Sequence, residues 1–187
     1  MSQAANISAL VTIIFGLMLT DLFASVHRLI RHRRRVRWHW LPMLVAWYVL
    51  AMVLKNWWAL AFQENTEVWG SGWIFLFYGH LFLLLYLLVS AVLPDEIPAG
   101  GVDLKEYYFT TRRHFWGLQA GVSLLLLGFS LLRPLFWEQT LSLGAVLSNA
   151  IMAAVAVSLA WSGRFAYHAV IVIVMVTLMA LEMAGKF

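Results

Sequence analysis

Three ionisable residues, Asp21, Lys55 and His80, interrupt long apolar stretches of this sequence. Burying a charged or titratable side chain in such a stretch is costly, so each marks a candidate site for binding or moving an ion or a polar solute. Lys55 supplies positive charge, and His80 can gain or lose a proton near neutral pH. Asn56 and Asn149 accompany them as neutral hydrogen-bonding groups. These five residues form the candidate polar site.

The stretches that carry these residues have the length and composition of membrane spans. Of the 187 residues, 63% are hydrophobic and 12% are charged, and the mean hydropathy is +0.81. Soluble domains carry about 25% charged residues, whereas about 20 apolar residues in a helix cross a membrane. We therefore predict an all-α polytopic integral membrane protein, a single transmembrane domain over residues 1–187 with six helices in a bundle. The predicted spans are residues 7–30, 40–62, 73–93, 115–132, 141–161 and 165–183.

Apart from Lys55, the basic residues are distributed unevenly between the two ends of these spans. Two of them, Arg133 and Lys186, lie at one end, and ten lie at the other. The ten are Arg28, Arg31, Arg33, Arg34, Arg35, Arg37, Lys105, Arg112, Arg113 and Arg164. Because positively charged loops stay in the cytosol during insertion, both termini are expected on the non-cytosolic side. Trp38, Trp40 and Trp161 fall at the arginine-rich end, as expected of an aromatic belt at the membrane interface.

The arginines at this end also indicate a partner, the headgroups of anionic lipids at the cytosolic face of the bilayer. We expect this headgroup-binding role for Arg31, Arg33, Arg34, Arg35, Arg37, Arg112 and Arg113. The net charge of +4 and the pI of about 9.7 could suggest a nucleic acid instead. The basic residues, however, sit in short turns between spans, so no nucleic-acid partner is predicted.

The longest connection, residues 94–114, lies on the predicted cytosolic side. Pro94 and Pro98 break helix there, and Asp103 followed by Glu106 resembles a capping box. We therefore expect a short interfacial helix from Asp103, which could continue into the fourth span. Six spans with an arginine-rich first turn and this proline-flanked acidic connection resemble bacterial inner-membrane proteins. The resemblance implies the bacterial cytoplasmic membrane and no activity.

The depths of the polar residues can be estimated from the helical rise. Lys55 and His80 lie ~10 Å below the outer ends of their spans, and Asn149 lies close to that level. Spans joined by a short loop are antiparallel neighbours, so Lys55, Asn56, His80 and Asn149 could share one hydrated layer. Alternatively, Lys55 could extend to the interface and His80 could bond a carbonyl group in a packed bundle. Asp21 lies ~10 Å inside the opposite face and has no basic neighbour one turn away on its own helix.

Three further histidines, His27, His114 and His168, fall near the cytosolic ends of the first, fourth and sixth spans. Imidazoles on facing helices can ligate haem or a metal, so these are weak metal candidates. No H-x₃-H or HExxH spacing supports them, and the absence of cysteine excludes thiolate sites. There is no G-x-S-x-G motif either. We predict no metal, no cofactor and no catalytic residue, and an enzyme is not favoured.

Small residues recur along the fourth and fifth spans, which lets membrane helices approach closely within one chain or between subunits. They are Gly117, Gly121, Ser123 and Gly128 on the fourth span, and Gly144, Ser148, Ala153 and Ala156 on the fifth. The leading hypothesis is a small channel- or transporter-like protein that moves an ion or small solute as a homo-oligomer. One alternative is an accessory or scaffold subunit of a larger membrane complex. Another is a haem- or metal-binding membrane enzyme.

Overall fold

The computed structural model describes residues 3–61, 72–136 and 140–185, and this part of the chain is helical almost throughout. Its long helices are α1 (Gln3–Arg31), α2 (Trp40–Ala61), α3 (Gly72–Val92), α4 (Leu104–Phe136), α5 (Leu143–Trp161) and α6 (Phe165–Ala184). All six are long and apolar enough to cross a membrane. The prediction of an all-helical, multi-pass membrane architecture is confirmed to that extent.

Helix α4 is one helix of 33 residues, so the helix from Asp103 continues into the predicted fourth span, which is the alternative that the sequence left open. The carboxylate Oδ1 of Asp103 accepts hydrogen bonds from the backbone N–H groups of Lys105 (2.9 Å) and Glu106 (3.2 Å). The helix therefore begins where the capping signal placed it. No glycine or proline follows until Gly117, so nothing ends the helix before the predicted fourth span. The expected short interfacial helix is not a separate element but the first turns of α4.

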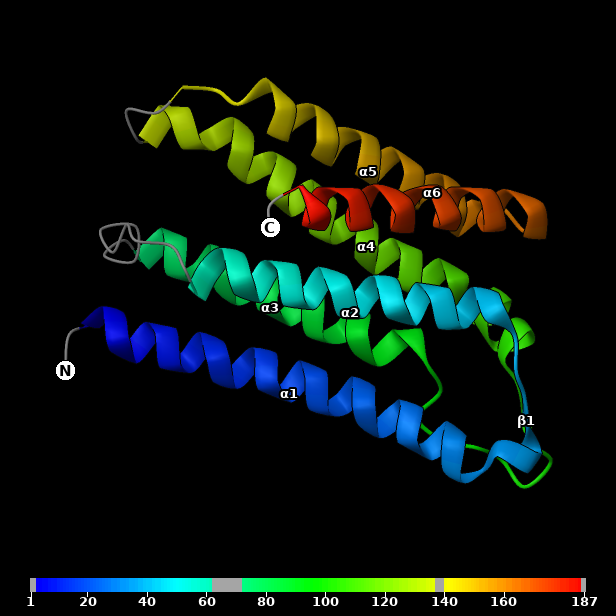
Figure 1. Cartoon of the computed structure of the whole chain (residues 1–187). Coiled ribbons are helices and arrows are strands. Elements are labelled where there is room, and N and C mark those ends of the chain that lie inside the picture. The colour runs from blue at the N-terminus through cyan, green and yellow to red at the C-terminus, as the bar shows by residue number, and fades with distance from the viewer. Residues whose placement is uncertain (1–2, 62–71, 137–139, 186–187) are drawn as a thin grey trace.

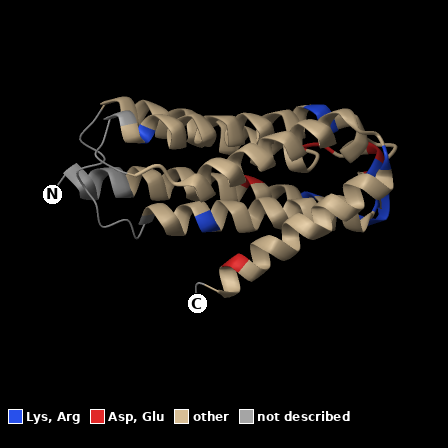
Figure 2. Ribbon diagram, turned by 90° about the horizontal axis from the view of Figure 1, so that it is seen from above, with Lys and Arg blue, Asp and Glu red and all other residues tan. Residues whose placement is uncertain are grey.

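The helices pack as a layered bundle (Figure 1). Helices α1, α2 and α3 contact one another, α3 contacts α4, and α4 has its most extensive contact with α5. Helix α6 packs mainly on α2, and it runs obliquely to the other helices (Figure 2). Most of the lysines and arginines gather at one end of the bundle, which we call the basic end (Figure 2). Helices α1, α3 and α5 finish there, and α2, α4 and α6 start there.

A short parallel pairing fixes the connections at the basic end. A 3₁₀ turn, η1 (Arg33–Arg35), leads into β1 (Val36–Arg37), which pairs with β2 (Val102–Asp103). Gly101, just before β2, has a φ of +89°, and a Cβ added there would lie 2.4 Å from the carbonyl oxygen of Arg35. Only glycine fits this backbone conformation and this close approach. The arginine-rich turn is thereby held against the start of α4.

The deeply buried small residues of α4 and α5 are alanines and a serine rather than the glycines of these helices. Ala156 is fully buried, and Ala153, Ala160, Ala120 and Ser123 are nearly so. A Cβ added at Gly117, Gly128 or Gly144 would meet no atom within 4 Å. The predicted close approach of these two helices is therefore found, but these three glycines do not produce it.

Candidate functional site

The predicted polar residue Lys55 forms an ion pair that the sequence analysis did not anticipate. Its Nζ donates to Oε2 of Glu182, which lies near the end of α6. From Trp40 to Lys55 the helix rises ~22 Å, and from Phe165 to Glu182 it rises ~26 Å. If both helices start at the membrane boundary, the pair lies in the far third of a ~30 Å hydrocarbon core. It links α2 to α6 at that depth.

This ion pair is not sealed inside the chain. The exposed fractions of the Lys55 and Glu182 side chains are 36% and 42%. Charged groups at membrane depth are normally covered by protein or by water, because hydrocarbon solvates them poorly. The uncovered part of the pair must therefore meet water or another subunit.

The remaining residues of the candidate polar site have other partners. Asn56 donates through Nδ2 to the carbonyl oxygen of Met52 at 2.8 Å, and His80 donates through Nδ1 to that of Leu76 at 2.7 Å. Each bond joins two residues of the same helix, α2 for Asn56 and α3 for His80. The bond of His80 to a carbonyl oxygen is the alternative that the sequence analysis gave for this residue. Asn149 is half-buried on α5, and Asp21 is half-buried on α1. Asp21 makes no ion pair with any residue of the described segments.

A second polar cluster, which the sequence analysis did not assemble, lies buried near the basic end. We call it the Tyr108 cluster, and it consists of Tyr108, Trp116 and His168. Trp116 Nε1 donates to the Tyr108 hydroxyl at 3.0 Å, and that hydroxyl lies 2.7 Å from His168 Nδ1. His168 Nε2 lies 3.0 Å from the carbonyl oxygen of Ser162, at the end of α5. The exposed fractions of the three side chains are 4%, 0% and 0%.

The hydrogen-bond directions in the Tyr108 cluster can be assigned from its chemistry. An indole N–H can only donate, so the hydroxyl of Tyr108 accepts from Trp116 and directs its own proton to His168 Nδ1. His168 Nδ1 is then the acceptor, and Nε2 carries the proton that goes to the Ser162 carbonyl oxygen. Both ring nitrogens of a neutral imidazole are therefore occupied. The cluster joins α4 to the start of α6.

These bonds bear directly on the weak metal candidates. His168 can ligate a metal only if one of its two hydrogen bonds breaks, whereas His27 and His114 are exposed on α1 and α4. Across residues 3–61, 72–136 and 140–185, no three histidine, aspartate or glutamate side chains are grouped as metal ligands. The proposed histidine layer is thus not assembled as a ligand set in this part of the chain.

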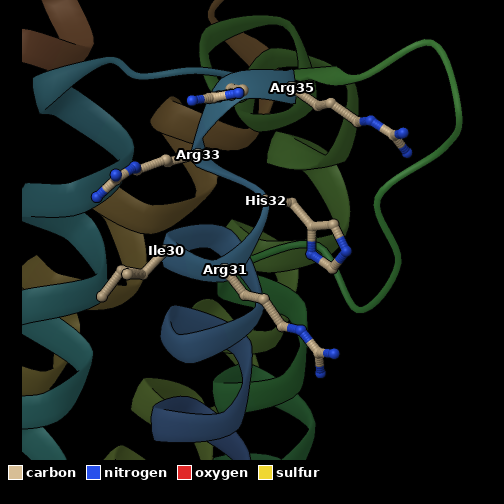
Figure 3. Close-up of a pocket in the computed structure, with 6 residues that line it drawn as sticks. Ile30, Arg31, His32, Arg33 and Arg35 are labelled. Atoms are coloured by element: carbon tan, nitrogen blue, oxygen red, sulfur yellow. The ribbon is translucent and has the colours of Figure 1, made fainter.

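The seven arginines expected at lipid headgroups divide into groups. Arg112 donates through Nε to the Ser162 carbonyl oxygen at 3.0 Å and through a terminal nitrogen to the Phe109 carbonyl oxygen, so it stabilises the C-terminal end of α5. Arg37 pairs with Asp103 at 3.8 Å. Arg113 is exposed on α4. The remaining four are Arg31, Arg33, Arg34 and Arg35, and they line an open hollow at the basic end (Figure 3).

A polar stripe along α4 was also missed from sequence. Tyr108, Arg112, Trp116, Gln119 and Ser123 fall within an arc of about 80° at 100° per residue, so they share one helix face. The exposed fractions of Gln119 and Ser123 are only 3%, and the Gln119 Oε1 atom has no hydrogen-bond partner among the described residues. Buried amide oxygens are nearly always paired with protein or water. The spacing of these residues would have revealed the stripe.

No family model, curated protein or solved structure matches this chain. The chemistry of the described residues is therefore the basis for any functional assignment. That chemistry comprises a partly open ion pair at membrane depth, a buried polar stripe on α4 and a group of arginines at the basic end.

Proposed function

We propose that this chain forms a helical, oligomeric channel or carrier that moves a small ion or polar solute across the membrane. The observation that carries the proposal is the Lys55–Glu182 ion pair, because more than a third of each side chain is uncovered. A charged pair at this depth requires water or a second subunit. A water-filled route, completed by neighbouring subunits where needed, meets this requirement.

The buried stripe on α4 supports the same proposal from a second helix. The unpaired Oε1 of Gln119 lies about 10 Å along α4 from Arg112, which is well inside an apolar helix. A water or solute molecule would satisfy this oxygen. Asp21 on α1 is a further carboxylate with no ion-pair partner in the described segments. Four helices, α1, α2, α4 and α6, thus carry polar groups that a hydrated pathway would accommodate.

The pair gives the proposed pathway a testable selectivity. A permeating anion would replace Glu182 as the partner of Lys55, whereas a permeating cation would replace Lys55 as the partner of Glu182. Because Lys55 and Glu182 neutralise each other, a permeating ion would bind to either of them weakly enough to be released. Exchanging the two charges keeps the pair but reverses which helix carries each sign.

Flux into proteoliposomes tests the proposal. The purified chain is reconstituted, and uptake is followed for protons with an internal pH dye, for K⁺ and Cl⁻ with ion-selective electrodes, and for urea and glycerol by light scattering. The variants are Lys55→Gln, Glu182→Gln and the double exchange Lys55→Glu/Glu182→Lys. Arg113→Gln is the matched control, because it removes one charge from an exposed residue at the opposite end of the bundle.

We expect the wild type and Arg113→Gln to conduct at least one of these species above protein-free liposomes. Each neutral variant at the pair should lower that flux at least tenfold, and the double exchange should change the ratio of the permeating species. Wild-type flux equal to that of protein-free liposomes for all five probes would refute the proposed conduction of these species. Equal flux in the wild type and both neutral variants would exclude the pair from the pathway.

A second function, an accessory or scaffold subunit of a larger complex, is favoured by a different observation. The outer faces of α5 and α6 expose large apolar side chains along their full length, among them Leu143, Leu147, Ile151, Leu178 and Leu181. A partner helix could pack there and also cover the Lys55–Glu182 pair. Purification in mild detergent followed by mass spectrometry separates the two functions. A stoichiometric partner of different sequence favours the scaffold, and self-association alone favours the oligomeric channel.

A further inference from the structure

The acidic groups at the basic end leave most of its arginines without a partner. Asp95 pairs with Arg28 at 3.3 Å, and Asp103 pairs with Arg37 at 3.8 Å. No ion pair within the described segments involves any of the four arginines between them. These four are Arg31, Arg33, Arg34 and Arg35. Four guanidinium groups within five consecutive residues repel one another and attract an anion from outside the chain.

These arginines line an open hollow. Residues 30–35 line a space of about 500 Å³ that is open to the exterior. Arg31, His32 and Arg35 point to one side of the turn, whereas Ile30 and Arg33 point to the other (Figure 3). Because guanidinium groups form a planar fork of donors, they are suited to bind phosphate oxygens in pairs. The two-sided arrangement matches phosphates that lie around the turn rather than one compact ligand enclosed by it.

The backbone of the turn is held in place by contacts of its own. His32 Nδ1 donates to the carbonyl oxygen of Arg28 at 3.0 Å, and the backbone N–H of Arg35 donates to the carbonyl oxygen of His32 at 2.7 Å. Beyond the turn, Val36 pairs with Val102 across the two strands. The arginine side chains therefore start from a fixed backbone, which lowers the entropy lost on binding.

The surroundings of the hollow distinguish a lipid from a free anion. Trp38, Trp40 and Trp161 are exposed at the basic end, with exposed fractions of 45%, 47% and 73%. Exposed tryptophans of membrane helices favour the headgroup level, so the neighbouring turn lies at or just beyond that level. The exposed apolar side chain of Ile30 also lines the hollow beside the arginines. A ligand with a phosphate and an apolar chain would contact Arg33 and Ile30, which point to the same side of the turn (Figure 3).

We propose that the turn Arg31–Arg35 is a binding site for the phosphate groups of anionic phospholipids, with an acyl chain against Ile30. The site is independent of the proposed transport function, since it uses none of the residues of the Lys55–Glu182 pair. The other three arginines expected at headgroups are not part of it. Arg37 pairs with Asp103, Arg112 stabilises the end of α5, and Arg113 lies on α4 outside the hollow.

Lipid retention by the full-length chain tests this site. The chain is purified in detergent and titrated with phosphatidylglycerol or with phosphatidylcholine, and bound lipid is counted by native mass spectrometry. Variants are Arg31→Gln, Arg35→Gln, Ile30→Ser and a variant in which all four arginines become lysine. Arg113→Gln is the matched control, because it removes one exposed arginine of α4 that lies outside the hollow. The lysine variant keeps the charge that orients the protein in the membrane but removes the planar forks.

We expect tighter binding of phosphatidylglycerol than of phosphatidylcholine, and about a fivefold loss of affinity for each arginine replaced by glutamine. Ile30→Ser and the four-lysine variant should also weaken lipid binding, whereas Arg113→Gln should change it less than twofold. Inorganic phosphate at millimolar concentration should not displace the lipid. If phosphate displaces the lipid and Ile30→Ser does not change lipid binding, the site binds free phosphate, and the lipid assignment is overturned. An equal effect of Arg113→Gln and Arg31→Gln would show diffuse surface attraction and no site.

Discussion

Replacing Tyr108 with phenylalanine removes one hydroxyl from the centre of the Tyr108 cluster. That hydroxyl accepts a hydrogen bond from Trp116 Nε1 at 3.0 Å and donates one to His168 Nδ1 at 2.7 Å. The substitution therefore leaves two buried polar groups without a partner. A lost hydrogen bond of this kind contributes about 1 kcal/mol, and bilayer measurements average about 0.6 kcal/mol. We expect Tyr108→Phe to lower the free energy of unfolding by about 1–2 kcal/mol.

The neighbouring tyrosine provides a matched control. The Tyr107 hydroxyl donates to the carbonyl oxygen of Ala91 at 3.5 Å from a half-buried position. A bond this long contributes little, so Tyr107→Phe should change the free energy of unfolding by less than about 0.5 kcal/mol. Both variants lose one oxygen atom from adjacent positions of α4, so the comparison isolates the surroundings of each hydroxyl, namely its hydrogen bonds and its burial.

Unfolding in mixed micelles of mild detergent and dodecyl sulfate, followed by circular dichroism, measures both changes. A third variant, His168→Phe, and its combination with Tyr108→Phe complete a double-mutant cycle. If the two side chains are coupled, the combined loss should be smaller than the sum of the separate losses by at least 0.5 kcal/mol. Equal stabilities of the Tyr108→Phe and Tyr107→Phe variants, or simple additivity in the cycle, would refute the assigned hydrogen-bond chain.

Two further predictions concern packing. Gly101→Ala should destabilise the basic end by about 2–4 kcal/mol, because a left-handed conformation costs an alanine about 1–2 kcal/mol and its Cβ would also displace the carbonyl group of Arg35. Hydrogen exchange of the Val36 and Val102 amides measures this loss of stability, and unchanged protection of these amides would contradict the prediction. Ala156→Leu should cost about 1–3 kcal/mol, since Ala156 is fully buried, whereas Gly144→Ala on the same helix should stabilise by up to about 1 kcal/mol. Micelle unfolding compares these two variants, and equal stabilities would show that Ala156 is not closely packed.

The sequence was sufficient to predict the features that depend on local composition. Runs of about 20 apolar residues indicated the helices, and the capping chemistry of Asp103 located the start of α4. Successive loops lie at alternate ends of the bundle, and the arginine-rich loops are every second one. The sequence therefore predicted that the arginines gather at one end. Each of these features depends on residues that are close together in the chain.

Contacts between distant residues could not be predicted in the same way. Helices α2, α3, α5 and α6 are apolar on nearly all faces, so no amphipathic pattern shows which face packs against a neighbour. The pairing of Lys55 with Glu182 and of Tyr108 with His168 depends on these rotations. The pairing of β1 with β2 spans only two residues, and the positive φ of Gly101 is visible only in the folded chain.

Helix α6 makes polar contacts near both of its ends, and contacts at the two ends join it to different helices. His168, near its start, binds Tyr108 of α4, and Glu182, near its end, binds Lys55 of α2. Between them, Val172 and Met175 supply only apolar burial. Neutralising Lys55 therefore removes the ion pair near the end of α6 and leaves the Tyr108 cluster near its start intact. A change in flux in Lys55→Gln alone could come from movement of α6, whereas a changed preference among ions in the double exchange requires the charges themselves to meet the solute.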